Sequence, residues 1–430
     1  MTSPAIFDLI VIGAGPGGYS VAAEAAATGL SVALIEKELA GGTCLNRGCI
    51  PTKALCHSAA HCPDTPYTEA VEHKNEVVAT LRQGVESLIA KTTIYKGEAV
   101  IRPQHIVEVN GETLTAPRII IATGSAPASL PIEGADLTID STDMLSLDEL
   151  PDSLAIIGGG VIGMEFASML NLRGVKVTVI EYCKEILPAF DPDIAKRLRM
   201  SLKKRGVEFI TSAAVTAVSR DDDSMFRVDY ISKDKPKSLT AQKVLMAVGR
   251  KAVVPAGAVE SGIVLDRRGF IVTDNNMQTS VEGIFAIGDV NGRCLLAHAA
   301  EAQGRKVLGL PVELDIIPSV AFTNPPCSMV GMTPSQCEAS GFKPLAASAT
   351  YYSNGYAVAT DQTEGMVKML FHPESLKLVG CSITGAGADL MIATPAMAML
   401  AGADLKTMQS LVYAHPTLSE ILSTAARNLK

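Results

Sequence analysis

Two cysteines, Cys44 and Cys49, lie close together in a glycine-rich stretch and could form a redox-active disulfide. A disulfide holds its two Cα atoms at most ~6.8 Å apart, whereas five steps along a regular helix rise ~7.5 Å. The two cysteines therefore cannot share one undistorted helix. Because Pro51 is tolerated only in the first turn of a helix, we expect a helix to begin near Cys49–Pro51, with Cys44 in the preceding loop.

This geometry places Cys49 at a helix N-terminus, where the helix dipole favours a thiolate. A bridge across such a kink is expected to be strained and easily reduced, which suits catalysis better than structural cross-linking. The spacing alone also allows a second interpretation, in which both cysteines are buried and unpaired.

His415 and Glu420 form a second candidate pair near the C-terminus. Pro416 keeps His415 out of helical geometry, so its imidazole is expected on an extended residue. The run from Thr417 to Glu420 also fits a capping box that opens the last helix. The residues alone therefore favour a structural role for Glu420.

Two glycine-rich turns each follow a buried apolar strand and precede a helix, which is the pattern of a dinucleotide-binding unit. In each unit a second strand ends at an acid at the same offset from the first glycine, and a later strand ends at another glycine. The chain thus predicts two dinucleotide sites. The residues are Gly13, Gly15, Gly18, Glu36 and Gly124 in the first unit, and Gly158, Gly160, Gly163, Glu181 and Gly249 in the second.

Length and composition exclude several other classes of protein. The 430 residues suffice for two or three domains, and 47% hydrophobic with 19% charged residues is a globular balance. With a net charge of −8, we expect no nucleic-acid partner, and the basic run Lys196–Arg205 is expected to be the exposed face of a helix. No apolar run reaches the ~18 residues of a membrane span, and no signal peptide is evident. The odd number of cysteines, nine, predicts a reducing compartment such as the cytoplasm.

One or two helices are expected between Lys53 and Thr93. Their Cys56, His57, His61 and Cys62 include ligand types that bind zinc or copper, but the spacing matches no standard zinc pattern, so we predict no metal.

The stretch from Gly41 to Lys53 resembles the redox-active disulfide motif of the flavin-dependent pyridine nucleotide–disulfide oxidoreductases. Its Ile-Pro-Thr-Lys ending is most similar to that of the dihydrolipoamide dehydrogenases, and the resemblance runs to the C-terminus. It implies an α/β fold with two Rossmann-like dinucleotide-binding domains, for FAD and NAD, plus a C-terminal α+β dimerisation domain. The expected ranges are 1–146 and 268–315 for FAD, 147–267 for NAD and 316–430 for the interface.

The resemblance also implies roles for single residues. Substrate thiolate would attack Cys44, Cys49 would lie next to the flavin, and His415, oriented by Glu420, would act as base on the disulfide of the partner subunit. Lys53 and Glu165 match positions that pair beside the flavin, although an ordinary ion pair is an alternative. Residues matching the FAD site are Gly13, Gly15, Gly18, Glu36, Lys53, Gly124, Asp289 and Ala297, and those matching the NAD site are Gly158, Gly160, Gly163, Glu165, Glu181 and Gly249.

The C-terminal region is expected to contain strands at Tyr356–Ala359, Gly365–Leu370 and Leu378–Ile383, followed by helices. Pro395 should interrupt the helix expected from Leu390 to Leu400. Two residues there depart from the family pattern: Thr394 replaces a common acid, and Tyr413 replaces a frequent histidine.

The implied activity is oxidation of protein-bound dihydrolipoyl groups, with electrons passing through the disulfide and FAD to NAD⁺. The expected partners are a second copy of the chain and a lipoyl-bearing protein of a 2-oxo-acid dehydrogenase or glycine-cleavage complex. Glu181 favours NAD over NADP, because a carboxylate accepts bonds from a ribose hydroxyl and repels a 2′-phosphate. The alternatives are another NAD(P)H-dependent disulfide reductase of the family and a non-catalytic flavoprotein scaffold.

Overall fold

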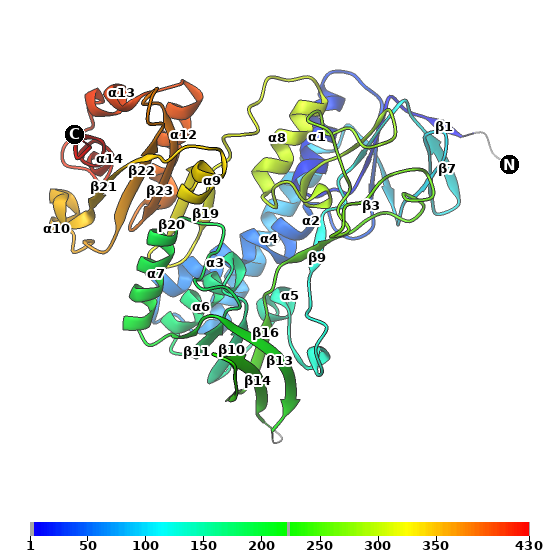
Figure 1. Cartoon of the computed structure of the whole chain (residues 1–430). Helices are drawn as coiled ribbons and strands as arrows, with labels where there is room; N and C mark the ends of the chain where they lie inside the picture. The colour runs from blue at the N-terminus through cyan, green and yellow to red at the C-terminus, as the bar shows by residue number, and fades with distance from the viewer. Residues whose placement is uncertain (1–3, 222–223, 430) are drawn as a thin grey trace. The chain divides into compact units, whose positions relative to one another are not determined.

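The computed structural model describes residues 4–221 and 224–429 (Figure 1). The chain divides into two compact units. Unit 1 comprises Met1–Leu55, Pro66–Ala128 and Gly249–Leu314, and unit 2 comprises Cys56–Thr65, Ser129–Val248 and Asp315–Lys430. Within the described ranges, no helix is both long and apolar enough to cross a membrane.

Unit 1 is built on a five-stranded parallel sheet in the order β18-β8-β2-β3-β4. Its central strand β2 is buried along its whole length, as expected for the apolar run from Phe7 to Ile12. The strands are β2 (Leu9–Ile12), β3 (Val32–Glu36), β4 (Thr93–Lys96), β8 (Arg118–Ile121) and β18 (Ile284–Ala286). A second, four-stranded sheet contains β1 (Ala5–Ile6), β7 (Glu112–Thr115), β6 (Ile106–Val109) and β5 (Val100–Arg102).

Helices α1 (Pro16–Ala27) and α8 (Ala297–Val307) pack against each other in unit 1. Glycine makes this close approach possible, because a Cβ atom on Gly17 would lie 3.0 Å from the Cβ of Ala300. The same unit holds α2 (Gly42–Arg47), the first part of α3 (Cys49–His61) and α4 (Tyr67–Leu88). The helices predicted between Lys53 and Thr93 are thus confirmed.

Unit 2 begins with the second dinucleotide-type sheet, in the parallel order β12-β11-β10-β16. Helix α6 (Val161–Leu172) follows β10, and α7 (Pro192–Lys204) buries its apolar side while its lysines face solvent, which confirms the prediction for the basic run. The strands are β10 (Ser153–Ile157), β11 (Lys176–Ile180), β12 (Glu208–Ile210) and β16 (Lys243–Met246), with an antiparallel sheet of β13 (Ala213–Arg220), β14 (Phe226–Ser232) and β15 (Lys235–Ala241).

The C-terminal part of unit 2 is an antiparallel sheet in the order β19-β20-β23-β22-β21. Strands β22 (Met366–Phe371) and β23 (Leu378–Thr384) confirm two predictions, with β19 (Ser319–Ala321), β20 (Cys327–Gly331) and β21 (Leu345–Thr350) beside them. The helices are α9 (Pro334–Ala339), α10 (Gly355–Ala359), α11 (Ala388–Met391), α12 (Ala393–Leu400), α13 (Leu405–Ser410) and α14 (Glu420–Arg427).

The predicted strand at Tyr356–Ala359 is wrong. These residues form helix α10, whose start is capped by the side chain of Asn354, which accepts a hydrogen bond of 2.9 Å from Ala357 N. An asparagine cap outweighs the β-propensity of so short a run. The predicted break near Pro395 is confirmed, but it precedes the proline: α11 ends at Met391, and Pro395 lies in the first turn of α12, where its missing N–H is tolerated.

A buried ion pair joins the C-terminal sheet to the start of α7. The Lys368 ammonium lies 2.9 Å from the Asp191 carboxylate and 2.7 Å from that of Asp193. The Asp191 side chain is only 1% exposed and also accepts a bond from Asp193 N, thereby capping the helix.

We expect Lys368→Met to lower the free energy of unfolding by about 3 kcal/mol, because it leaves the Asp191 charge buried without its cation. Chemical denaturation with a fluorescence or circular dichroism readout measures this change. Lys377→Met, at an exposed position before β23, is the matched control. An equal effect of both substitutions would contradict the importance of the ion pair.

Candidate active site

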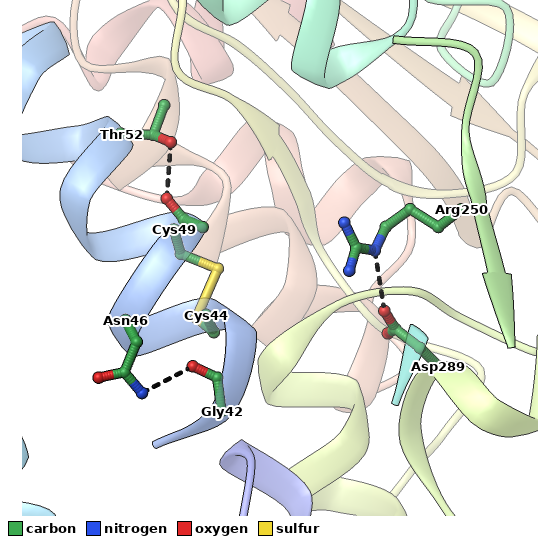
Figure 2. Close-up of a disulfide and its surroundings, with 8 residues drawn as sticks. Gly42, Cys44, Asn46, Cys49, Thr52, Arg250 and Asp289 are labelled. Carbon is green, nitrogen blue, oxygen red and sulfur yellow. Dashed lines mark hydrogen bonds and ion pairs between the residues drawn. A yellow bond between two sulfur atoms is a disulfide. The ribbon is translucent and has the colours of Figure 1, made fainter. Parts of the chain in front are cut away.

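Cys44 and Cys49 form a disulfide with their Cα atoms 4.6 Å apart (Figure 2). Helix α3 begins at Cys49, as predicted, but Cys44 lies inside the short helix α2 and not in a loop. The distance argument excluded only a single regular helix, and two helices that meet at Gly48 satisfy it equally well. Gly48 is required at this break, because a Cβ atom there would lie 2.9 Å from the carbonyl oxygen of Thr43.

Two polar side chains near the disulfide bond the backbone of the segments that meet at this break. Thr52 donates from Oγ1 to the carbonyl oxygen of Gly48 at 2.6 Å. Asn46 donates from Nδ2 to the carbonyl oxygens of Ala40 and Gly42, at 3.0 and 2.9 Å, and accepts from Arg82 Nε at 2.8 Å. Figure 2 shows Thr52 and Asn46 on either side of the bridge. The sequence analysis missed these residues, although their polar side chains within a helical stretch were a usable signal.

The first glycine-rich turn leaves room for a ligand and not for side chains. Gly13 has φ +101°, and a Cβ atom on Gly18 would lie 1.8 Å from the carbonyl oxygen of Gly13. By contrast, a Cβ on Gly15 would meet nothing within 4 Å, so this space at the start of α1 is open. The turn in unit 2 repeats the pattern: Gly158 and Gly163 are crowded, and Gly160 is open. Both turns fit a pyrophosphate at a helix N-terminus.

Glu36 and Glu181 each accept hydrogen bonds from backbone N–H groups of their glycine-rich turn and of the residues after the strand. The sequence analysis did not predict this structural role. Glu36 accepts from Ala14 N at 2.7 Å and from Glu38 N at 2.8 Å. Glu181 accepts from Gly159 N at 2.5 Å and from Cys183 N at 2.6 Å. Each carboxylate therefore fastens its glycine turn to the end of the following strand. Each oxygen retains a second lone pair that a ribose hydroxyl could use.

Gly124, Gly249 and Asp289 come together in unit 1. Strands β9 (Ser125–Pro127) and β17 (Arg250–Ala252), which follow the two glycines, pair antiparallel. Asp289, in the 3₁₀ helix Gly288–Asn291, accepts a hydrogen bond from Ser125 Oγ and lies 3.6 Å from Arg250 Nε. Gly249, expected at the NAD site, thus lies in the unit that carries the first glycine-rich turn.

Helix α8 begins at Ala297 and has no side-chain cap at its N-terminus. Its first backbone N–H groups can therefore bind an acceptor, as the sequence analysis expected of Ala297. Buried Gln303 on this helix accepts from Gly288 N and Asn291 Nδ2, both at 2.8 Å, and so connects α8 to the turn that carries Asp289.

Lys53 and Glu165 lie in different units, and their pairing stays a prediction. Lys53 is half-buried on α3 of unit 1. Glu165, on α6 of unit 2, is 4% exposed and accepts from Phe322 N at 2.9 Å.

The His415 ring and the Glu420 carboxylate are hydrogen-bonded, Nδ1 to Oε1, at 2.9 Å. The second oxygen of Glu420 accepts from Thr417 N at 2.9 Å. This backbone bond and the His415 ring lower the pKa of Glu420, so its carboxylate is ionised at neutral pH. The predicted capping box is only half formed: α14 begins at Glu420, and the Thr417 hydroxyl donates to Ala414 O instead.

Tyr413, two residues before His415, is packed against the C-terminal core. Burial raises the pKa of its hydroxyl to about 12, so the phenol stays neutral. A neutral phenol replaces the titratable group that a histidine would place here.

The rings of His57 and His61 stack on α3 with their centroids 4.4 Å apart. Within residues 4–221 and 224–429, no three His, Cys, Asp or Glu side chains gather into a metal-binding group.

The contrast between Gly15 and Gly18 can be tested by alanine substitution. We expect Gly18→Ala to disturb the fold, since the new methyl group would collide with the backbone of Gly13. Gly15→Ala should keep the melting temperature of the apoprotein and weaken binding of the flavin at least tenfold, because its methyl group would enter the open phosphate space. Melting curves and flavin titrations of both apoproteins distinguish the two effects. Full flavin affinity in Gly15→Ala would show that no phosphate uses this space.

Comparison with known proteins identifies the family. The model of the pyridine nucleotide-disulphide oxidoreductases matches residues 7–304, and the model of their dimerisation domain matches residues 317–426. The chain is 36% identical to dihydrolipoyl dehydrogenase of Chlamydia muridarum, over 98% of this chain and 96% of the relative. It is 37% identical to the enzyme of the same name from Geobacillus stearothermophilus, over 97% and 95%.

A solved structure is also similar over its full length. The Cu(II) complex of the HOCl-induced flavoprotein disulfide reductase RclA from Escherichia coli matches with a TM-score of 0.90 and 31% identity, covering 100% of both chains. With two dinucleotide turns, a disulfide at a helix start and these relatives, the chain is a member of the pyridine nucleotide–disulphide oxidoreductase family, whose cofactors are FAD and NAD(H).

Proposed function

We propose that the protein is a dihydrolipoamide dehydrogenase, which oxidises protein-bound dihydrolipoyl groups to the lipoyl disulfide and reduces NAD⁺. The His415–Glu420 hydrogen bond carries this proposal, because a dithiol must lose a proton before it can attack a disulfide. Thiols of ordinary pKa, near 8.5, are mostly protonated at neutral pH. Glu420 orients the ring through Nδ1, which leaves Nε2 of His415 to accept the proton.

The thiol exchange then proceeds in two steps. The substrate thiolate attacks Sγ of Cys44, a mixed disulfide forms, and Cys49 leaves as a thiolate stabilised by the N-terminus of α3. The second substrate thiol displaces Cys44, which takes up that thiol's proton, while His415 keeps the first. The substrate has lost two electrons, and the protein disulfide has gained them.

The groups that hold the cofactors follow from the site. Bound FAD supplies the two-electron acceptor that links the reduced cysteines to NAD⁺. In unit 1, the Gly13–Gly18 turn would hold its pyrophosphate, Asp289 its ribityl chain and the N-terminus of α8 the polar edge of its ring. We place Lys53, paired with Glu165, beside that ring. Glu181 would bind the NAD ribose in unit 2 and disfavour a 2′-phosphate.

A homodimer would complete each active site, with His415 acting on Cys44 of the partner subunit. In the single chain the His415 side chain is 79% exposed, which suits a residue that serves another subunit. The matched dimerisation domain also exposes large apolar side chains, as expected of a surface that a second copy covers. These are Leu390, Met397, Leu400 and Val412, exposed by 77%, 68%, 65% and 88%. Thr394 and Tyr413 would affect the packing there.

The lipoyl-bearing partner would be a subunit of a 2-oxo-acid dehydrogenase or glycine-cleavage complex. We further propose a reducing compartment, the cytoplasm. All nine cysteines lie in the described part of the chain, and Cys44–Cys49 is the one disulfide among them. A protein of an oxidising compartment would be expected to carry further, structural disulfides.

A second candidate is a reductase that oxidises NAD(P)H to reduce a disulfide other than the lipoyl disulfide. The full-length likeness to RclA, itself a flavoprotein disulfide reductase, favours it. In this candidate, electrons pass from NAD(P)H to a disulfide substrate, which is the reverse of the first proposal. Dihydrolipoamide is not its substrate.

A steady-state assay of the purified holoenzyme distinguishes the two candidates. With dihydrolipoamide, we expect rapid reduction of NAD⁺, much slower reduction of NADP⁺, and a long-wavelength absorbance band from a thiolate beside oxidised flavin. Cys49→Ser should abolish the band and the turnover while the flavin stays bound. Turnover with other disulfides and NAD(P)H, but none with dihydrolipoamide, would instead support the second candidate.

His415→Ala should slow oxidation of dihydrolipoamide about 10²–10⁴-fold, since it removes the general base. Electron transfer from NADH to an artificial acceptor that bypasses the disulfide should change little. Stopped-flow measurement of each half-reaction gives both rates, and His73→Ala, on the exposed side of α4, is the control. Equal slowing of both half-reactions would mean that His415 only maintains the structure.

A further inference from the structure

We propose that Ser125 and Arg250 are positioning residues for FAD, which fix one carboxylate oxygen of Asp289 so that the other can bind the cofactor. The inference rests on FAD as the cofactor of this family and not on the choice of substrate. All three residues lie in unit 1, although they are far apart in the sequence. They come from β9, β17 and the 3₁₀ helix Gly288–Asn291.

Arg250 donates two hydrogen bonds to Ser125. Its Nε donates to Ser125 Oγ and its Nη2 to the backbone oxygen of Ser125, both at 2.7 Å. The hydroxyl of Ser125 donates in turn to Oδ2 of Asp289, and Arg250 Nε lies 3.6 Å from the same oxygen. Figure 2 shows the Arg250 guanidinium pointing to the Asp289 carboxylate, in the surroundings of the disulfide.

The direction of this hydrogen-bond chain is fixed by chemistry. Arginine donates and cannot accept, so Ser125 Oγ must accept from Arg250 and use its only proton toward Asp289. The side chains of Arg250 and Asp289 are 14% and 24% exposed, and Ser125 is 8% exposed, so water competes weakly for these bonds. Among the described residues, the hydrogen bond to the Asp289 carboxylate goes to Oδ2, and the recorded approach of Arg250 Nε is to the same oxygen. Oδ1 is left to accept from a hydroxyl of the ligand.

The backbone supports the same arrangement. Gly124 and Gly288, directly before Ser125 and Asp289, have φ of +70° and +72°, a region that favours glycine. β9 and β17 pair so that Ser125 lies opposite Ala252, two residues beyond Arg250. Gly249, which the sequence analysis assigned to the NAD site, is therefore followed directly by an arginine that contacts Asp289 on the FAD side.

The test is a titration of apoprotein with FAD, followed by flavin fluorescence, for Ser125→Ala, Arg250→Lys and the double variant. Each single variant should bind FAD about tenfold more weakly, the loss of roughly one charge-assisted hydrogen bond. The double variant should be no weaker than Arg250→Lys, because both substitutions break one chain. Ser125→Thr, which keeps the hydroxyl, should restore most of the affinity.

Arg293→Lys is the matched control, since Arg293 donates to the backbone oxygens of Thr273 and Asp274 in the same unit and does not contact Asp289. Its FAD affinity should equal that of the wild type. Wild-type affinity in Ser125→Ala and Arg250→Lys, additive losses in the double variant, or failure of Ser125→Thr to recover would each overturn the proposal. A holoenzyme that is inactive with dihydrolipoamide but shows these FAD affinities would overturn only the proposed substrate.

Discussion

The chemistry of this protein depends on a helix that is interrupted at one residue. Gly48 ends α2 and lets α3 begin directly at Cys49, so two cysteines that one regular helix would hold apart come within 4.6 Å, Cα to Cα. The same break exposes the first N–H groups of α3 beside Cys49, where a thiolate needs them. Thr52, after the break, donates to the carbonyl oxygen of Gly48, and Asn46, before it, donates to the carbonyl oxygens of Ala40 and Gly42. Bridge formation and thiolate stabilisation therefore share one cause.

The two dinucleotide units stabilise their glycine-rich turns in the same way. A glycine turn must approach a phosphate closely and cannot be stiffened by its own side chains. In each unit an acid at the end of the next strand bonds the turn, Glu36 to Ala14 N and Glu181 to Gly159 N. A second repeated bond joins Ala14 O to Gly41 N and Gly159 O to Leu187 N. The acid that sequence patterns link to ribose binding thus also makes the turn rigid before a ligand arrives.

Much of this architecture could be predicted from the sequence, because buried parallel strands and glycine turns impose strong local patterns. The helix start at Cys49 followed from a distance limit and from Pro51. That limit could not distinguish a loop from a second short helix, which is why Cys44 was misplaced. Helix α10 was missed because its four predicted residues carry no clear period, and its capping Asn354 lies just outside them. Ser125 contacts Asp289 and Arg250, and each of these two residues lies more than a hundred positions from it in the sequence. No local sequence pattern can show such contacts.

The pairing of β9 with β17 closes the point at which the chain leaves unit 1 and returns to it. The polypeptide leaves unit 1 after Ala128 and returns at Gly249, and these two residues are hydrogen-bonded, N to O, at 2.9 Å. A segment whose ends meet in this way can be added or removed without opening the host that carries it. The glycine turn at Gly158 and its acid Glu181 therefore lie on a segment that leaves unit 1 and returns to it at a single junction.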